Sequence, residues 1–288
     1  MTEQYQQILV DYPRPKIKRI TLNRPEKRNP LSNIIRGEIF DALQKADMNE
    51  DVHVSILRGA GVCFSAGYDL GEDNRVNRPY WTPTAYYANW PRHVNHLWSM
   101  MADMVKPIIA QVHGYCLAGG SELASSCDLV YVAEDAQIGY PAVRSMMPPD
   151  LQYPTFIMGL RAAMEFMLTG SSINGIEAVR VGWANRAFPA GELEEKTLEM
   201  AEKVSKIPPD LQILNKRSVW QAMEIMGYRT QIRAGYNLHT LGSYQKSSRD
   251  FFSSITEGGL KKAWSDRDGK WGDYRTSKDQ KQHKEKKI

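Results

Sequence analysis

The chain has 288 residues and a formal net charge of +4, with 37 Lys and Arg against 33 Asp and Glu. This length can bury a large core, as one big domain or as a domain with an appendage. No apolar run is long enough to cross a bilayer, and the first residues lack a signal peptide's charged and apolar regions, so we expect a cytoplasmic protein. The three cysteines are scattered and odd in number, which suggests neither a disulfide framework nor a zinc site.

The hydrophobic pattern predicts alternating strands and helices through the first half of the chain. Short apolar runs predict strands at 17–22, 54–57, 107–112 and 129–133. Helical patterns lie between them at 32–48, 93–105 and 122–127. This alternation indicates βα or ββα units with buried sheets.

After Gly170 the pattern becomes mainly helical. Helices are expected at 175–182, 192–206 and 210–226, with breaks at Pro208-Pro209 and at Gly227. We find no low-complexity segment before the tail and no repeat at the level of sequence.

Two turns of small residues follow two of the expected strands. The first is Cys63-Phe-Ser-Ala-Gly-Tyr-Asp-Leu70, and the second is His113-Gly-Tyr-Cys-Leu-Ala-Gly-Gly-Ser-Glu-Leu-Ala124. A strand, a small-residue turn and a helix N-terminus expose backbone N–H donors, which a developing oxyanion needs. The alternative is a structural turn whose glycines only let helix and strand pack closely.

Five segments, in order, resemble the crotonase (enoyl-CoA hydratase/isomerase) superfamily. The two turns resemble its paired oxyanion-hole motifs, F-x-A-G-x-D-L and G-x-x-x-G-G-G-x-E-L. Segment 20–31 resembles the N-terminal strand and coenzyme A loop, and segments 127–130 and 136–139 resemble the later core. The similarity runs over about residues 20–188, with a fainter echo to residue 274.

The resemblance implies an α/β crotonase fold, a right-handed spiral of ββα units followed by a C-terminal helical trimerisation region. We expect the spiral core over residues 1–200, the helical region over 201–276 and a basic, flexible tail over 277–288. In the family the C-terminal helices extend outward and cover a neighbour's site, so the resemblance implies a homotrimer or a dimer of trimers.

The same resemblance implies an acyl-CoA substrate, with coenzyme A as part of the substrate and no other cofactor. Matching motif to motif, the oxyanion-hole N–H groups belong to Tyr68 and Gly119. They would hold the thioester oxygen as its negative charge grows. The coenzyme A end would lie near Lys27, Arg28, Ala66 and Leu70, with the alternative that Lys27 and Arg28 are plain surface charges.

The proton-transfer groups depart from the family pattern. Glu122 matches the first of two hydratase glutamates, but the second position is Ala142, which cannot transfer a proton. Asp150 stands eight residues later, where the family's dienoyl isomerases and aryl dehalogenases place a working aspartate. We expect Glu122 and Asp150 to be catalytic. The alternatives are a helix-dipole role for Glu122 and an N-cap role for Asp150 in a helix starting near Leu151.

The segment 79–90 is dense in aromatic residues and follows the first turn, where the family carries a variable substrate loop. Aromatic walls favour a broad or cyclic acyl group, although aromatics also fill subunit interfaces. The expected substrate pocket contains Trp81, Tyr140, Ala142 and Met146. His93 and His96 lack an evident carboxylate partner, so no metal site is expected.

The sequence therefore predicts an enoyl-CoA hydratase or an enoyl/dienoyl-CoA isomerase for a bulky or cyclic acyl group. One alternative is a hydrolase or C–C bond-cleaving member acting on a cyclic β-keto substrate. Another is a non-catalytic protein that binds RNA through the lysine-rich tail 277–288, although a solubilising tail fits that segment better. No nucleophile elbow around Ser121, no Walker loop and no dinucleotide fingerprint is present.

Overall fold

The computed structural model describes residues 4–71 and 96–274. Its described strands are β1 (Ile8–Arg14), β2 (Ile17–Leu22), β3 (Val54–Gly59), β4 (Ile108–Val112), β5 (Tyr115–Leu117), β6 (Leu129–Ala133), β7 (Gln137–Gly139) and β8 (Arg186–Phe188). Its described helices are α1 (Asn33–Met48), α4 (His96–Met101), α5 (Gly119–Ser125), α6 (Pro154–Thr169), α7 (Gly175–Arg180), α8 (Leu193–Ser205), α9 (Pro209–Ile225), α10 (Tyr228–Ser243) and α11 (Lys246–Asp268). Two 3-10 turns, η1 (Pro25–Lys27) and η3 (Pro141–Arg144), complete the described elements.

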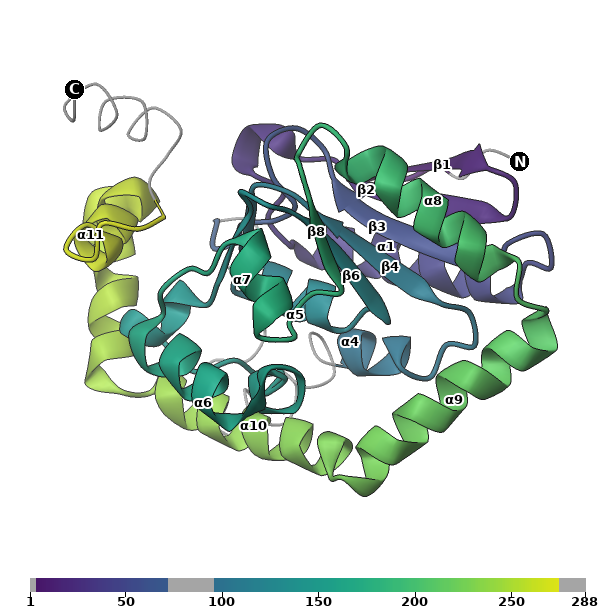
Figure 1. The fold of residues 1–288 in the computed structure, drawn as a ribbon. Helices are drawn as coiled ribbons and strands as arrows, with labels where there is room; N and C mark the ends of the chain where they lie inside the picture. Colours follow the sequence, from purple (N-terminus) through teal and green to yellow (C-terminus); the bar gives the residue numbers. More distant parts are fainter. Residues whose placement is uncertain (1–3, 72–95, 275–288) are drawn as a thin grey trace.

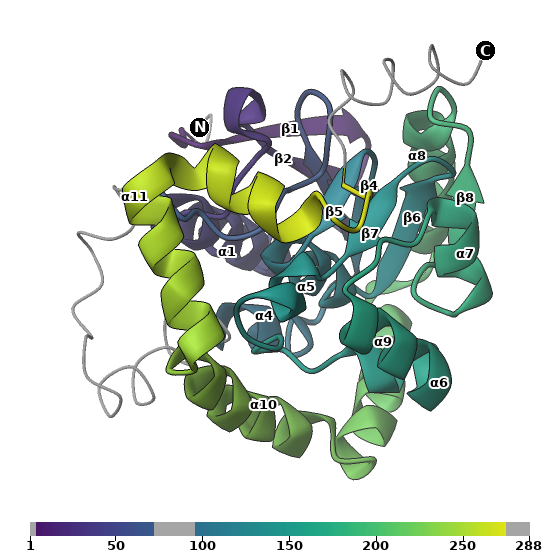
Figure 2. The same cartoon turned by 90° about the vertical axis from the view of Figure 1, so that its left-hand side faces the viewer.

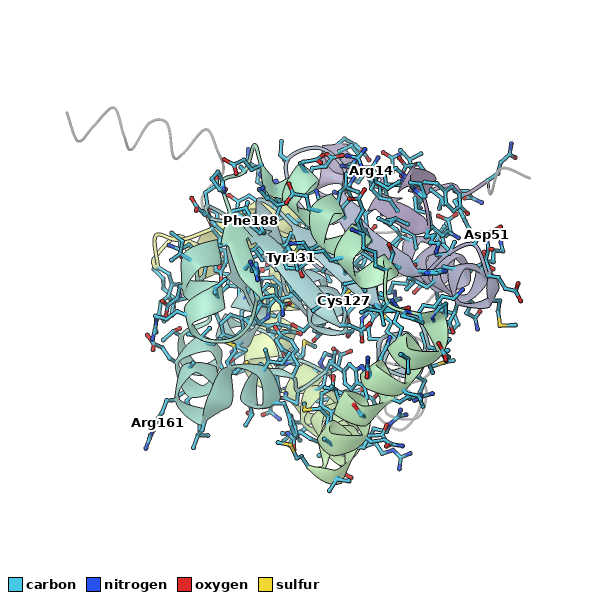
Figure 3. The ribbon with its side chains drawn as sticks, turned by 45° about the vertical axis from the view of Figure 1, so that its right-hand side comes forward. Arg14, Asp51, Cys127, Tyr131, Arg161 and Phe188 are labelled. Carbon is cyan, nitrogen blue, oxygen red and sulfur yellow. The ribbon has the colours of Figure 1, made fainter. Side chains whose placement is uncertain are left out.

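Six strands form one sheet in the order β1-β2-β3-β4-β6-β8. β1 runs antiparallel to β2, and every later pair is parallel. All five residues of β4 are buried, as expected for a central parallel strand covered on both faces. Figure 3 labels Tyr131 of β6 and Phe188 of β8 on this sheet. The centroids of their two rings lie 6.2 Å apart.

A second set of short extended segments follows β3, β4 and β6. β5 pairs in parallel with β7, with Cys116 opposite Ile138. Ser65, which follows β3, bridges to Cys116, and Ile138 bridges to Ile173. Successive turns of the chain therefore stack side by side, as a spiral of ββα units requires.

Helices α1 and α8 lie on opposite sides of the six-stranded sheet (Figures 1 and 2). Ser32 caps α1, because its side-chain oxygen accepts from the Ile35 N–H at 3.2 Å. Ile35 and Ile39 of α1 and Leu198 of α8 are buried in the main core. The amphipathic pattern that predicted both helices thus corresponds to their packed faces.

The C-terminal helices pack against their own chain. The His239 Nδ1 atom of α10 lies 2.9 Å from the Pro148 carbonyl oxygen, and the Ser248 hydroxyl of α11 donates to the Met146 carbonyl at 2.6 Å. Figure 2 shows α11 crossing the molecule after α10. These contacts attach α10 and α11 to the core of the same chain, and the expectation that the C-terminal helices extend outward to cover a neighbouring subunit stays a prediction.

The cysteines lie inside the core as free thiols, at Cys63, Cys116 and Cys127. Burial raises the pKa of Cys63 to about 11, so this thiol keeps its proton at neutral pH. Among the described helices, none combines the length and the apolar character needed to cross a membrane.

Candidate active site

The first small-residue turn forms a corner beside Leu31. The Leu31 N–H donates to the Gly67 carbonyl at 2.8 Å, and the Asp69 N–H donates to the Leu31 carbonyl at 3.3 Å. Tyr68 is the middle residue of this parallel bridge, so its own N–H faces away from Leu31. Gly67 has a φ of +106°, a conformation that favours glycine.

The second turn forms a corner at the start of α5. Gly119 is the first residue of this helix, so its N–H has no acceptor inside the helix. The Ala118 N–H donates to the Gly139 carbonyl at 2.9 Å, and the Ala118 carbonyl accepts from the Glu122 N–H at 3.1 Å. These bonds fix the direction in which the corner faces.

The two corners lie against each other. A Cβ atom added to Gly67 would lie 3.0 Å from the Leu117 carbonyl oxygen and 3.6 Å from the Gly119 nitrogen. A Cβ atom added to Gly120 would lie 2.7 Å from the Ser65 carbonyl oxygen. Glycine permits this close approach, which brings together the residues predicted to supply the oxyanion donors.

Glu122 is fully buried on α5, and a phenol contacts each of its carboxylate oxygens. The Tyr68 hydroxyl donates to Oε2 at 2.5 Å, and the Tyr140 hydroxyl donates to Oε1 at 3.0 Å. The Trp98 indole N–H donates to the Tyr68 hydroxyl oxygen at 3.2 Å. Four side chains from separate segments therefore form one connected polar cluster.

Asp150 is also fully buried and interacts with Glu122. Burial raises the pKa of Glu122 well above its ordinary value, and the charge and hydrogen bond of Asp150 raise it further. The hydroxyls of Tyr68 and Tyr140 act in the opposite direction, because they stabilise the ionised carboxylate. The structure thus brings the two predicted catalytic carboxyl groups together.

The N-cap alternative for Asp150 is wrong. Helix α6 begins at Pro154 and its N-cap residue is Tyr153, so Asp150 lies before the helix and does not cap it. The Tyr153 hydroxyl instead donates to the Ser121 hydroxyl at 2.8 Å, which joins this segment to α5.

The two phenols beside Glu122 hold their protons firmly. Burial raises the pKa of Tyr68 well above its usual value, and the charges of Asp150 and Glu122 raise it further. The Arg36 guanidinium, 5.7 Å from the centre of the Tyr68 ring, acts in the opposite direction. Burial likewise raises the pKa of Tyr140. Both hydroxyls therefore remain hydrogen-bond donors at neutral pH.

The residues predicted to bind coenzyme A lie around the first corner. Lys27 is exposed at the end of η1, and the Arg28 carbonyl accepts from the Ala66 N–H at 3.0 Å. Leu70 packs against the small cluster that contains Phe251 of α11. Their role in binding coenzyme A stays a prediction.

The predicted pocket residues have different positions. Tyr140 contacts Glu122 directly, Ala142 is buried in η3, and Met146 packs between the main core and α11. Trp81, the aromatic segment 79–90, His93, the His96 side chain and the tail 277–288 lie outside the described residues and side chains.

Sequence reasoning missed what several side chains do beside Glu122. Tyr68 was assigned through its backbone, Tyr140 as a pocket wall, and Trp98 had no assigned role. The sequence did offer one clue to the role of Tyr140. Its phenol lies two residues before Ala142, the position where the second carboxylate is missing. Nothing local in the sequence links Trp98 to Tyr68, because the tertiary fold makes that contact.

Comparisons with known proteins identify relatives of this chain. The model of the enoyl-CoA hydratase/isomerase family matches residues 14–265. The mevalonyl-coenzyme A hydratase sidH of Aspergillus fumigatus is 35% identical over 208 residues, which cover 70% of this chain and 74% of that protein.

Solved structures show the same fold. The enoyl-CoA hydratase from Mycobacterium smegmatis superposes with a TM-score of 0.87 at 27% identity, covering 94% of this chain and 96% of that one. An enoyl-CoA hydratase/isomerase from Xanthobacter autotrophicus gives a TM-score of 0.86 at 30% identity, covering 93% of this chain and 99% of that one. These matches confirm the expected crotonase fold. The chain therefore belongs to the enoyl-CoA hydratase/isomerase family.

Proposed function

We propose that this enzyme hydrates an enoyl-CoA thioester or moves its double bond, with Glu122 and Asp150 as the proton-transfer pair. One observation carries the proposal: the two carboxyl groups are fully buried and interact, next to the two corners that contain Tyr68 and Gly119. Buried, interacting carboxyl groups are typical of acid–base sites.

The first task of such a site is to stabilise an enolate. In the proposed complex the thioester oxygen accepts hydrogen bonds from the N–H groups of Tyr68 and Gly119. Negative charge on this oxygen increases as the reaction proceeds, so donors that are already in place stabilise the transition state more than the substrate.

The second task is proton transfer, for which Ala142 offers no group. Burial and the neighbouring Asp150 raise the pKa of Glu122, which favours its protonated form. In the proposed mechanism, one carboxyl group of the pair accepts a proton and the other supplies one. In isomerisation, the ionised carboxylate removes a proton from the acyl chain and the protonated carboxyl returns one two carbons away, as the double bond moves. In hydration, the carboxylate takes a proton from the water that attacks the β-carbon, and the carboxyl group protonates the α-carbon.

We further propose a flat or cyclic acyl group. Among the described residues, Tyr68 and Tyr140 contact Glu122 directly, and Trp98 contacts the Tyr68 hydroxyl. Aromatic walls next to the reacting carbons favour planar substrates over short flexible ones.

For the assembly, we propose the homotrimer or dimer of trimers typical of the fold, in the cytoplasm. Support comes from large apolar side chains exposed on α9 and α10, including Leu214 at 64%, Ile225 at 88% and Leu241 at 61%. Exposed apolar surface of this kind marks interaction sites. Light scattering after gel filtration measures the mass, and a monomeric mass would contradict this assembly.

A substrate panel tests the proposed reaction. Straight-chain and cyclic enoyl-CoA thioesters, a dienoyl-CoA and a cyclic β-diketone are incubated with the full chain, and products are separated by chromatography. A product that has gained one water molecule identifies a hydratase, and a product with a shifted double bond identifies an isomerase. Turnover of the diketone alone would contradict the proposal.

Two variants then test the roles of the carboxyl groups. Glu122→Gln and Asp150→Asn should each lower kcat by about 10²-fold or more, with nearly unchanged affinity for coenzyme A. Glu165→Gln is the matched control, because Glu165 is exposed on α6. Full activity in Asp150→Asn would remove this residue from the mechanism.

A further inference from the structure

The cluster at Glu122 contains a hydrogen-bond chain with a defined direction. An indole N–H can only donate, so the Tyr68 hydroxyl oxygen accepts from Trp98 at 3.2 Å. A phenol has one proton, and that of Tyr68 is directed to Glu122 Oε2 at 2.5 Å. Trp98 therefore orients the Tyr68 hydroxyl, and Tyr68 in turn holds the carboxylate.

The two oxygens of Glu122 are held by different phenols. Tyr68 approaches Oε2 from the first corner, and Tyr140 approaches Oε1 from the end of β7. Donors on both oxygens fix the plane of the carboxylate group. A proton acceptor needs such a fixed orientation toward the carbon or water that it serves.

The position of the Tyr68 ring is built into the fold. A Cβ atom on Gly119 would lie 2.8 Å from two carbon atoms of this ring, so the ring rests on the bare Cα of Gly119. Trp98, which holds the hydroxyl, is only 2% exposed. The phenol is therefore packed in place rather than free to sample the solvent.

The charged and titratable groups around Glu122 explain why this site needs the phenols. Asp150 and burial favour the protonated form of Glu122, whereas Tyr68 and Tyr140 favour its ionised form. Arg36 faces the Tyr68 ring from α1. The two phenols therefore oppose the rise in the pKa of Glu122 that burial and Asp150 cause.

We propose that Tyr68, oriented by Trp98, is a positioning residue that holds the Glu122 carboxyl group in the orientation needed for proton transfer. This role of the side chain is separate from the oxyanion role of the Tyr68 N–H group. The inference rests on the proposed function, in which Glu122 transfers protons. It also explains how Glu122 can transfer protons in a site that has Ala142 in place of a second glutamate.

The test is Tyr68→Phe, which removes the hydroxyl and keeps both the ring and the backbone N–H. We expect kcat to fall about tenfold or more while KM changes less than about threefold. The limb of the kcat/KM profile that reports Glu122 should move to higher pH by about one unit, because a donor to the ionised form is lost. Trp98→Phe should move it in the same direction by less.

Tyr153→Phe is the matched control. It also removes the hydroxyl of a fully buried tyrosine next to α5, but that hydroxyl binds Ser121 rather than Glu122. The control should lose stability without moving the pH profile. An unmoved profile in Tyr68→Phe, or an equal shift in both variants, would overturn the inference.

A second measurement separates this inference from the proposed function. NMR titration of isotope-labelled glutamate, with the Glu122 signal assigned by its loss in Glu122→Gln, reports the acidity of Glu122 without a substrate. If the wild-type protein converts no acyl-CoA, the proposed function fails, and this titration alone decides the positioning role. A higher pKa of Glu122 in Tyr68→Phe supports the role, and an unchanged pKa overturns it.

Discussion

The Arg144 guanidinium donates to both carboxylate oxygens of Asp273, at 2.7 and 2.6 Å. It also donates to Asp268 at 3.1 Å and lies 4.6 Å from the centre of the Trp271 ring. Because Arg144 ends η3, these contacts attach the residues at the end of α11 to the segment that begins with Tyr140. The C-terminal helices thus support the candidate site from within the same chain.

Breaking this attachment should destabilise the protein. In Arg144→Ala, two carboxylates lose a partner whose side chain is only 2% exposed, so we expect the free energy of unfolding to fall by about 3 kcal/mol. Denaturant unfolding measures the change. Arg161→Ala, at an exposed position of α6, should stay within about 0.5 kcal/mol of wild type. Equal stability of Arg144→Ala and wild type would contradict this role.

Stability should decrease as pH rises through the titration of Glu122. The folded state raises the pKa of Glu122 well above the unfolded value of about 4.3, so folding favours the protonated form. The stabilising contribution is complete below the unfolded pKa and is lost as pH rises through the folded pKa, at about 1.4 kcal/mol for each unit of difference.

Glu122→Gln isolates this effect. The amide cannot ionise, so the variant should lose this part of the pH dependence and exceed wild-type stability at alkaline pH. Unfolding curves for both proteins between about pH 5 and 9 test the prediction. Parallel stability profiles would show that Glu122 ionises as easily in the folded as in the unfolded chain.

A buried ion pair should hold α9 against the core. The Lys216 ammonium donates to Asp128 at 2.8 Å and to the Lys106 carbonyl at 3.0 Å, and the Trp220 indole donates to the other Asp128 oxygen at 2.9 Å. Lys216→Met leaves the largely buried Asp128 carboxylate without its counter-charge, so we expect the free energy of unfolding to fall by about 3 to 5 kcal/mol.

The double variant Asp128→Asn with Lys216→Met provides the comparison. It removes both charges and should recover part of the lost stability, as measured by denaturant unfolding. If Asp128→Asn lowers the stability of Lys216→Met by as much as it lowers the stability of the wild type, the two residues act independently. The ion pair would then have no stabilising role.

Gly119 should tolerate no side chain. A Cβ atom there would contact the Tyr68 ring at 2.8 Å, so Gly119→Ala should displace the ring from Glu122 and lower kcat by about tenfold or more. Gly37→Ala in α1 is the control, because nothing lies within 4 Å of its Cβ position. This control variant should keep full activity, and its free energy of unfolding should rise by about 0.5 to 1 kcal/mol. Steady-state kinetics on the purified variants tests this, and full activity in Gly119→Ala would contradict the packing argument.

Local sequence patterns predicted many of the elements closely. The strands 17–22 and 129–133 agree with β2 and β6, and the helices 192–206 and 210–226 agree with α8 and α9 within one residue at each end. Elements with weak local signals were missed as strands or helices. The strands β5, β7 and β8 have three residues each, too few for a periodic pattern. Helices α10 and α11 lie within the expected helical region 201–276, but their individual bounds were not predicted.

The sequence by itself determined the family, the two corners and the presence of Glu122 and Asp150 as candidate acids. Glycine spacing and apolar runs carry this information, because they constrain the backbone locally. Only the tertiary structure decided that Tyr68, Trp98 and Tyr140 form one cluster with Glu122, and that Asp150 lies beside it instead of capping α6. These contacts join residues far apart in the chain, and their distances depend on how the turns of the spiral stack, which no local pattern encodes.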